Sequence, residues 1–220
     1  MNTTSPRFGA LADQLRAESR DGRVLVAVAG EPGAGKTTFV QRLAAELERL
    51  GVATGVLPMD GFHLSNAVLE KLGRRQRKGA IDTFDADGYV HLLERVSAGE
   101  ARAVYAPGFD HGAGEPVAGS IAIEPGCAVV LTEGNYLLDP TEPWDRVPEL
   151  ADHAWYVTVD DALRRERLIA RHIASGKPPE VARRWVAAVD EPNAERIRTT
   201  AVRAELILRL DQSPGGSGQS

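Results

Sequence analysis

The chain of 220 residues has one cysteine, Cys127, so no internal disulfide can form and its stability must come from a packed core. No apolar run reaches the roughly 18 residues that a membrane-spanning helix needs. Residues 1–6 are polar and lack the apolar core of a signal peptide. The net charge of −5 argues against a general nucleic-acid binder, which is usually basic. These absences predict a cytoplasmic protein that works without a membrane or a nucleic acid.

What is present is the composition of a globular domain. Hydrophobic residues make up 43% of the chain and charged residues 26%, over a length that can bury a sizeable core. We expect one domain over residues 1–212, followed by a disordered tail over residues 213–220, which contain mainly glycine and serine. Cys127 lies in an apolar run, which indicates a buried core thiol rather than a catalytic one.

A glycine-rich loop between an apolar strand and a helix is the most informative segment. Gly30, Gly35, Lys36 and Thr37 fit the pattern G-x-x-x-x-G-K-[ST], the P-loop, whose backbone N–H groups surround a polyphosphate. In this pattern Lys36 reaches the β- and γ-phosphates, and the Thr37 hydroxyl binds Mg²⁺. The residues expected to bind the nucleotide are Gly30, Glu31, Pro32, Gly33, Ala34, Gly35, Lys36, Thr37 and Thr38.

Apolar strands alternate with amphipathic helices along the chain. We expect strands at residues 24–29, 54–58, 128–132, 154–159 and 205–210, and helices at residues 8–20, 36–50, 66–72, 87–97, 161–175, 178–189 and 193–201. Residues 73–85 are expected to be a loop, and residues 103–119 irregular apart from a small hairpin that ends near residues 120–123. The alternation predicts an α/β fold of the P-loop NTPase type, with a doubly wound, mainly parallel sheet and helices on both faces.

Polar side chains follow the ends of three predicted strands. The P-loop follows the first strand, Asp60 follows the second, and Glu133 follows the strand at residues 128–132. Because ligands bind at the carboxyl ends of parallel strands, these groups should meet at one edge. Asp60 is then the candidate general base for phosphoryl transfer to an alcohol, or else a turn aspartate before Gly61. Glu133 holds Mg²⁺, touches the acceptor, or merely ends its strand.

Three further features each have two interpretations. The basic run at residues 73–79 either lies near an anionic or polar acceptor or is a solvated face. Arg164, Arg167 and Arg171 share one face of the predicted helix at residues 161–175. That helix is either a mobile lid that closes over the phosphates or a surface helix with Arg–Glu pairs. His63 either contacts the substrate or caps the next helix.

Taken together, these motifs resemble the uridine kinase, phosphoribulokinase and type I pantothenate kinase group of P-loop kinases, over roughly residues 22–210. The acceptor-base segment around Asp60, the Thr132-Glu133-Gly134 strand end and the two arginines of the lid carry the likeness. Residues 105–110 and 133–138 are most similar to the branch of fructose-transport-type and nucleoside/nucleotide kinase-like proteins.

This resemblance implies ATP and Mg²⁺ as cofactors and completes the candidate site. The catalytic residues would be Asp60, Lys36, Arg167 and Arg171, the metal ligands Thr37 and Glu133, and the adenine contact Asn193. The acceptor would contact His63, Arg77, Lys78, Asp85, Tyr105, His111, Glu133 and Asn135. The chain departs from pantothenate kinases in having Lys36-Thr37 where they usually have Lys-Ser. It departs from uridine kinases in having Asp60-Gly61 where they have Asp-Asp or Asp-Ser, so the acceptor stays open.

The favoured function is ATP-dependent phosphoryl transfer to a hydroxyl of a small metabolite, which is a nucleoside, a sugar or a pantothenate-like alcohol. The alternative is a nucleotide-hydrolysing regulatory ATPase or binding module without a small-molecule acceptor. Residues 85–88 fit the short D-x-x-G pattern of GTPases, but no Asn-Lys-x-Asp segment follows, which argues against guanine specificity. Homodimerisation stays open.

Overall fold

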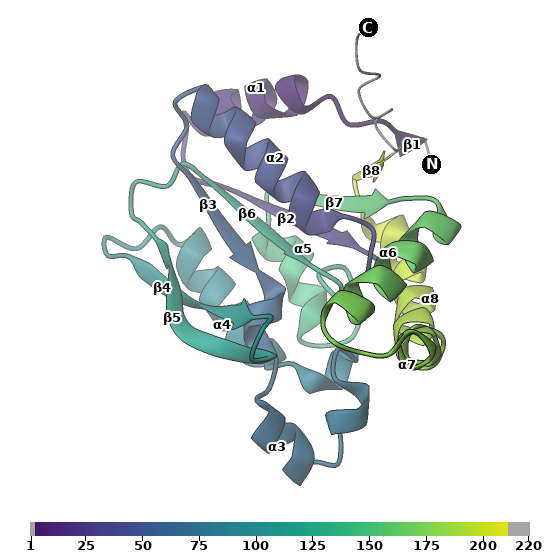
Figure 1. The fold of residues 1–220 in the computed structure, drawn as a ribbon. Helices are drawn as coiled ribbons and strands as arrows, with labels where there is room; N and C mark the ends of the chain where they lie inside the picture. The colour runs from purple at the N-terminus through teal and green to yellow at the C-terminus, as the bar shows by residue number, and fades with distance from the viewer. Residues whose placement is uncertain (1–2, 211–220) are drawn as a thin grey trace, which may run out of the picture.

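The structure is a computed structural model that describes residues 3–210, so the expected domain end at residue 212 and the tail beyond it lie outside the described residues. Within residues 3–210, six strands form one parallel sheet in the order β1-β8-β7-β2-β6-β3 (Figure 1). The strands of this sheet are β1 (Thr3–Thr4), β2 (Val24–Gly30), β3 (Thr54–Pro58), β6 (Val129–Gly134), β7 (His153–Thr158) and β8 (Leu206–Arg209). The predicted parallel sheet is confirmed.

Helices cover both faces of this sheet. The helices are α1 (Phe8–Glu18), α2 (Lys36–Arg49), α3 (Asn66–Lys71), α4 (Ala86–Ser97), α5 (Val147–Leu150), α6 (Asp161–Ala174), α7 (Pro179–Trp185) and α8 (Glu191–Thr199). Alternate residues of β2 pack into two hydrophobic cores, one on each face of the sheet, because successive side chains of a strand point to opposite faces. Val26 and Val28 pack with α1 and α2, whereas Leu25 and Ala27 pack with α4, α5 and α8 (Figure 1). This is the doubly wound arrangement that the sequence predicts.

The chain connections run in opposite directions across the sheet around β2 and β6. The chain passes from β2 through α2 to β3, and later crosses from β6 past β2 to β7. Glu133 of β6 is in register with Val28 of β2 and with Pro58 of β3. The P-loop and the turn that holds Asp60 therefore emerge on either side of Glu133, as the sequence analysis expects of strand ends in a doubly wound sheet.

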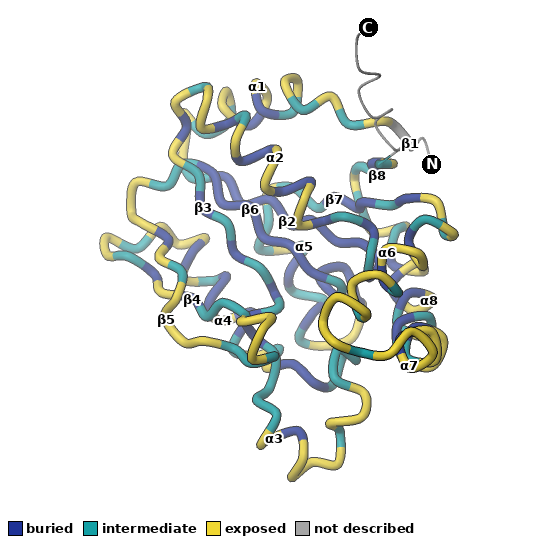
Figure 2. The backbone as a smooth tube through the Cα atoms, viewed as in Figure 1, coloured by how far each residue is buried: buried dark blue, intermediate teal, exposed yellow. Residues whose placement is uncertain are grey.

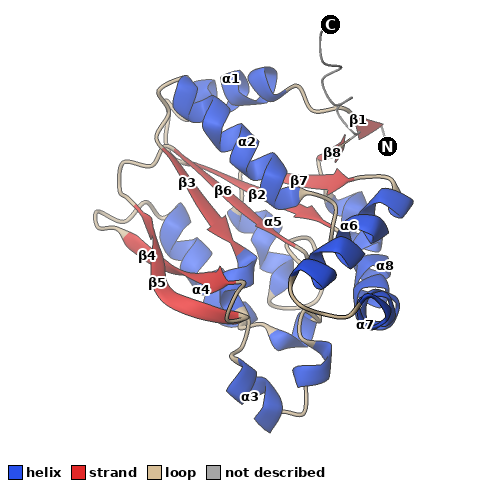
Figure 3. Ribbon diagram, in the orientation of Figure 1, coloured by secondary structure: helices blue, strands red, loops and turns tan. Residues whose placement is uncertain are grey.

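The expected hairpin is present and ends at Ile123, but it is longer than predicted and takes in most of the region expected to be irregular. Strands β4 (Val104–Asp110) and β5 (Glu115–Ile123) make a two-stranded sheet apart from the main one (Figure 3). The extent of the hairpin was not predicted because prolines interrupt the strand pattern. Pro107 lacks a backbone N–H and sits at a register shift between Ala106 and Gly108, so the pairing resumes beyond it.

Two smaller expectations are also corrected. Residues 73–85 contain two 3₁₀ turns, η2 (Arg75–Arg77) and η3 (Ile81–Thr83), rather than a plain loop. Cys127 is only partly buried, because it lies in the turn before β6 and not within the strand. Exposed residues are frequent on α3, on the connection between α6 and α7 and along the β4–β5 hairpin (Figure 2). No helix in the described part of the chain is long and apolar enough to cross a membrane.

His153 links α1 to the sheet through two carboxylates. Its Nδ1 lies 2.6 Å from Glu205 Oε1, and its Nε2 lies 2.6 Å from Glu18 Oε2. Both ring nitrogens can donate only when the imidazole is protonated. Burial alone lowers the pKa of His153, but the hydrogen bonds and charges of Glu18 and Glu205 outweigh it, so the pKa is raised above its ordinary value.

This arrangement predicts a pH-dependent contribution to stability. Because the pKa of His153 is higher in the folded state than in the unfolded state, protonation of His153 stabilises the fold. This stabilisation is complete below the unfolded-state pKa of about 6.5, and it is lost as the pH rises through the folded-state pKa. The free energy of unfolding of the wild type should therefore exceed that of His153→Gln by roughly 1 kcal/mol near pH 6, and by less above pH 8. Urea unfolding across this pH range measures the difference, with His91→Gln on exposed α4 as the control. A difference independent of pH would contradict a protonated His153.

Candidate active site

The P-loop has the backbone shape that its glycines allow. Gly33 and Gly35 adopt φ values of 81° and 93°, in the left-handed region that glycine occupies without strain. Gly35 is the N-cap of α2, and its carbonyl accepts a hydrogen bond from the Phe39 N–H at 2.9 Å. The first N–H groups of α2 thus lie at the end of β2, where a helix N-terminus favours an anion.

Lys36 is buried at the start of α2, with its charge held by polar groups. Its Nζ donates to Asn135 Oδ1 at 2.8 Å and to the Glu31 carbonyl at 3.2 Å. Burial lowers the pKa of Lys36, and the nearby charges of Glu133 and Asp60 partly oppose that shift. A desolvated cation at this place gains most from an incoming anion, since a phosphate would replace the hydration that burial removes.

Thr37 and Glu133 bring two oxygen atoms together beside Lys36. The Thr37 hydroxyl donates to Glu133 Oε1 at 2.7 Å, and Glu133 is only 6% exposed. Burial raises the pKa of Glu133, while the charge of Lys36 opposes this shift. The contact joins the P-loop helix to β6, so a hydroxyl and a carboxylate share one small site.

Asp60 lies on a 3₁₀ turn, η1 (Met59–Phe62), directly after β3. Its charge acts on Lys36, Glu133 and His63, which places the carboxylate among these three groups. A Cβ at Gly61 would collide with the carbonyl oxygen of Pro107, because the hairpin packs directly on this turn. The turn is therefore held between the main sheet and the hairpin, which fixes the position of Asp60.

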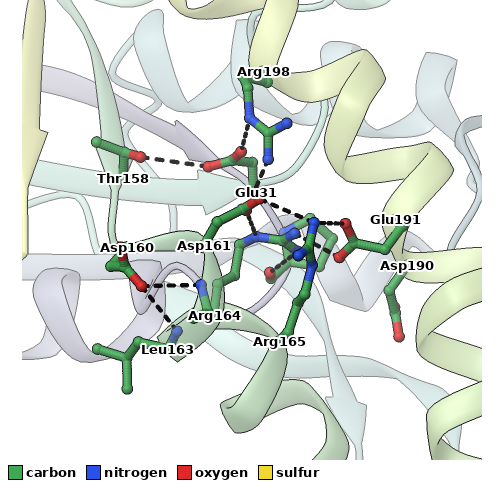
Figure 4. A network of polar contacts seen from close by, with 12 residues as sticks. Glu31, Thr158, Asp160, Asp161, Leu163, Arg164, Arg165, Asp190, Glu191 and Arg198 are labelled. Atoms are coloured by element: carbon green, nitrogen blue, oxygen red, sulfur yellow. Dashed lines mark hydrogen bonds and ion pairs between the residues drawn. The ribbon is translucent and has the colours of Figure 1, made fainter.

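An ionic network fixes the base of α6 against the P-loop (Figure 4). Arg164 is fully buried, and it donates to Asp161 at 2.9 Å and to Glu191 at 2.5 Å. Arg198 of α8 joins Glu31 of the P-loop at 2.7 Å to Asp161 at 2.9 Å. The network connects the P-loop, α6 and α8, three segments that are separate in the sequence.

The fold and this geometry can be compared with known proteins. A family model described as the phosphoribulokinase/uridine kinase family matches residues 25–209. The chain belongs to that family. It is a family of ATP-dependent kinases, and the resemblance seen in the sequence is thereby confirmed.

Proteins with several different names are similar to this chain. A Schizosaccharomyces pombe protein named "Putative uridine kinase C227.14" is 39% identical over 160 residues, covering 70% of this chain and 68% of that protein. A pantothenate kinase of Leifsonia xyli subsp. xyli is 31% identical over 215 residues, covering 85% of this chain and 66% of that protein. A crystal structure described as a "putative fructose transport system kinase" from Silicibacter sp. TM1040 superposes with a TM-score of 0.80 at 33% identity, covering 92% and 99% of the two chains.

The Thr37–Glu133 pair has the oxygen chemistry that suits a Mg²⁺ ion. Mg²⁺ takes oxygen ligands, usually one or two carboxylates together with water and substrate phosphates. Within residues 3–210, no group of three or more His, Cys, Asp or Glu side chains could hold a metal by itself. The hydroxyl and carboxylate 2.7 Å apart supply the two protein oxygens that such a shared site needs.

The kinase's basic run is engaged within the chain. Arg77 Nη1 donates to Asp82 Oδ1 at 2.8 Å, and Arg74 donates to the carbonyl of the same residue at 2.8 Å. Lys78 Nζ donates to Asn66 Oδ1 at 2.8 Å and to the Gly114 carbonyl at 2.6 Å. Lys78 thus ties the start of α3 to the tip of the hairpin.

Other residues expected at the acceptor or the nucleotide lie in different surroundings. Asp85 caps α4 by accepting a hydrogen bond from Gly88 N–H at 3.0 Å, which also explains the D-x-x-G pattern. Tyr105 is 64% exposed, on the opposite face of β4 from the core residue Ala106. His111 is exposed near the hairpin tip, with its ring 5.2 Å from that of Phe109. Asn193 is partly buried in the first turn of α8.

The three arginines of α6 do not act alike. Arg164 is fully buried as the anchor of the network, although the three arginines share one helical face in the sequence. Arg167 and Arg171 are exposed; a Cβ at Gly35 would lie 3.5 Å from Arg167 Nη1, and the charge of Arg171 acts on Lys36 and Glu133. The spacing of Asp161 and Arg164 indicates a helical pair, but no local pattern reveals the partners of Arg164 and Glu31 on α8. The N-cap of this helix is Asp160, whose side chain accepts a hydrogen bond from Ala162 N–H at 3.0 Å.

Removing Arg164 should destabilise the kinase far more than removing its neighbour. Arg165 contacts the same carboxylates, Asp161 and Glu191, but its side chain is 51% exposed. We expect Arg164→Ala to cost about 2–3 kcal/mol of unfolding free energy, because it leaves a cavity and unpaired, partly buried carboxylates. Arg165→Ala should cost about 0.5 kcal/mol or less. Denaturant unfolding of both variants tests this, and equal losses would mean that the network is merely a surface one.

Proposed function

We propose that the protein transfers the γ-phosphoryl group of ATP directly to a hydroxyl of a small metabolite, with Asp60 as the general base. The observation that carries this proposal is the meeting of three groups at one sheet edge. Glu133 is in register with both Val28, two residues before the P-loop, and Pro58, two residues before Asp60. An acceptor beside Asp60 would therefore lie next to the phosphates on the P-loop.

On the donor side, the P-loop backbone and Lys36 bind and orient the β- and γ-phosphates. Lys36 leaves Asn135 and the Glu31 carbonyl, its partners in this structure, to pair with phosphate oxygens. Thr37 and Glu133 would hold the metal ion, which neutralises charge on the phosphates when it is bound. Asn193, near Glu191 on α8, is the proposed contact for the adenine.

On the acceptor side, Asp60 accepts the proton of the attacking hydroxyl. Such a base must lie within hydrogen-bond reach of the hydroxyl. The hairpin packs against the η1 turn at Gly61, which supports a fixed position for Asp60. Direct transfer needs no covalent intermediate, so positioning and charge stabilisation carry the rate.

Arg167 and Arg171 are proposed to stabilise the charge that develops on the transferred group. The contacts of Arg164 fix the N-terminal end of their helix (Figure 4). The Arg167 guanidinium lies close to Gly35 of the P-loop, since a Cβ at Gly35 would be 3.5 Å from Arg167 Nη1. Arginine supplies such charge stabilisation in other phosphoryl transferases. Exclusion of water by these side chains would favour phosphoryl transfer to the metabolite over hydrolysis of ATP.

The identity of the acceptor is the finer part of the proposal. The names of the relatives point to a nucleoside, a pantothenate-like alcohol or a sugar. His63, Arg77, Lys78, Asp85, Tyr105, His111, Glu133 and Asn135 are the proposed acceptor residues. Of these, His63 contacts the Asp60 carbonyl, Asn135 contacts Lys36 and Glu133 contacts Thr37.

The test measures ADP release from Mg-ATP together with the mass of the product. The panel contains uridine, cytidine, fructose, ribulose 5-phosphate and pantothenate, with a no-acceptor control. A phosphorylated product from one acceptor supports the proposal. Hydrolysis at one slow rate with every compound, and no phosphorylated product, would instead establish a nucleotide-hydrolysing module.

A further inference from the structure

His63 offers one hydrogen-bond acceptor beside Asp60. Its Nδ1 lies 2.8 Å from the backbone oxygen of Asp60. A carbonyl oxygen can only accept, so Nδ1 carries the hydrogen and, in the neutral ring, Nε2 is an acceptor. Among residues 3–210, no group forms a hydrogen bond with Nε2, although most of the ring is enclosed by protein.

The surroundings of His63 disfavour protonation of its ring. The ring centroid lies 4.0 Å from that of Phe84 and 4.8 Å from that of Phe109. Burial lowers the pKa of His63; the charge and carbonyl of Asp60 oppose this shift, while Lys78 and His111 add to it. Two aromatic rings therefore cover the imidazole and leave the edge with Nε2 for a donor.

Most cations of the basic run are already engaged within the chain. Arg74 and Arg77 both pair with Asp82, at 3.3 and 2.6 Å. Lys78 uses its N–H donors on Asn66 and Gly114, has Glu115 at 3.9 Å, and lies over the Phe109 ring. Arg75 is exposed and has no ion pair within residues 3–210. A carboxylate or phosphate that bound Arg74, Arg77 or Lys78 would have to displace an existing contact, and beside Asp60 it would face a negative charge.

We propose that the acceptor is an uncharged molecule with at least two hydroxyl groups, of which one is phosphorylated beside Asp60 and another donates a hydrogen bond to His63 Nε2. This inference rests on the proposed kinase function and narrows its substrate class. A hydroxyl can donate to Nε2, whereas an ionised carboxylate or phosphate cannot. His63 is then a specificity-determining residue that binds the acceptor without moving the proton that Asp60 takes.

The first arm of the test uses the wild-type protein and matched compounds that differ by one charged group. The pairs are panthenol with pantothenate, ribulose with ribulose 5-phosphate, fructose with fructose 6-phosphate, and glycerol with glycerate. The inference predicts that the best acceptor is an uncharged member and that its charged partner has at least about tenfold lower kcat/KM, the effect of one lost hydrogen bond. A charged compound as best acceptor would overturn this inference and leave the kinase proposal standing. No phosphorylated product from any compound would overturn the kinase proposal itself.

The second arm uses variants of His63 with the best acceptor. His63→Asn keeps a donor for the Asp60 carbonyl but loses the acceptor at the position of Nε2, whereas His63→Gln reaches that position. We expect His63→Asn to raise the KM for the acceptor about tenfold, with kcat and the KM for ATP changed far less, and His63→Gln to restore part of the loss. His91→Asn, on the exposed face of α4, is the matched control. An unchanged acceptor KM in His63→Asn, with ATP binding intact, would exclude the contact.

A set of deoxy analogues completes the second arm. Removing the hydroxyl that contacts His63 should raise the KM of the wild type for the acceptor about tenfold. The KM of His63→Asn should not rise further, because this variant already lacks the same hydrogen bond. Additive losses for every hydroxyl would show that none of them donates to His63. This cycle separates direct contact from a merely structural role of the ring.

Discussion

Asp60→Asn lowers kcat for phosphoryl transfer by about 10²–10⁴-fold if Asp60 is the general base. Asparagine keeps the size and shape of the side chain but cannot take the hydroxyl proton at neutral pH. The η1 turn is held between the sheet and the hairpin by the close approach of Gly61 and Pro107, so the variant should keep its backbone. The loss should therefore fall on kcat, and the KM for ATP should stay within about twofold.

The measurement is product formation with the best acceptor, at saturating ATP, for the wild type and Asp60→Asn. Asp87→Asn is the matched control, since Asp87 is an exposed residue on α4. ATP binding, measured by direct titration, should be similar in all three proteins. Turnover of Asp60→Asn within about tenfold of the wild type would rule out general-base catalysis by this residue, and Asp60 would then be only a turn residue before Gly61.

The donor side of the site could be predicted from sequence because its determinants are local. The P-loop residues lie within one stretch, Gly30 to Thr37, and the strand before it is apolar throughout. Asp60 and Glu133 are far apart in the chain, but both follow apolar strands, and a parallel sheet brings such ends to one edge. The observed register of β3, β6 and β2 agrees with that reasoning.

The acceptor side could not be predicted as well, because it is assembled from separate segments. His63, Phe84 and Phe109 come from three different elements, and only tertiary packing places their rings together. Tyr105 shows the same difficulty: its place in the motif indicates a substrate contact, but the alternation of β4 turns it outward, opposite Ala106. A hairpin interrupted by Pro107 has no clear strand pattern, so this alternation could not be predicted.

Charge patterns were ambiguous for a related reason. Arg164, Arg167 and Arg171 share a helical face, and their spacing cannot distinguish a buried ion pair from an exposed phosphate contact. The partner of Arg164 is Glu191, 27 residues further along the chain. Such long-range pairs explain why a basic stripe on one helix divides into a structural arginine and two exposed ones.

Lys36→Met should lower kcat by about 10²–10³-fold, the cost of losing one preorganised cation aimed at the developing charge. Lys36 is buried beside the P-loop, and its Nζ is held by Asn135 and the Glu31 carbonyl until it exchanges them for phosphate oxygens. The methionine side chain fills a similar volume without the charge, and the P-loop backbone that wraps the phosphates stays. Binding of ATP should weaken less than turnover, because the backbone N–H groups of the P-loop remain.

Two measurements separate these effects: steady-state product formation, and titration of the protein with ATP in the absence of an acceptor. Lys71→Met, an exposed lysine at the end of α3, controls for the loss of a positive charge. Burial lowers the pKa of Lys36. If deprotonation of Lys36 limits turnover, the activity of the wild type should therefore fall at a pH below the ordinary pKa of a lysine. The negative charge of bound phosphate raises the pKa of Lys36 again. Saturating ATP should therefore move the alkaline loss of activity to a higher pH. Lys36→Met has no amine at this position and cannot show this movement.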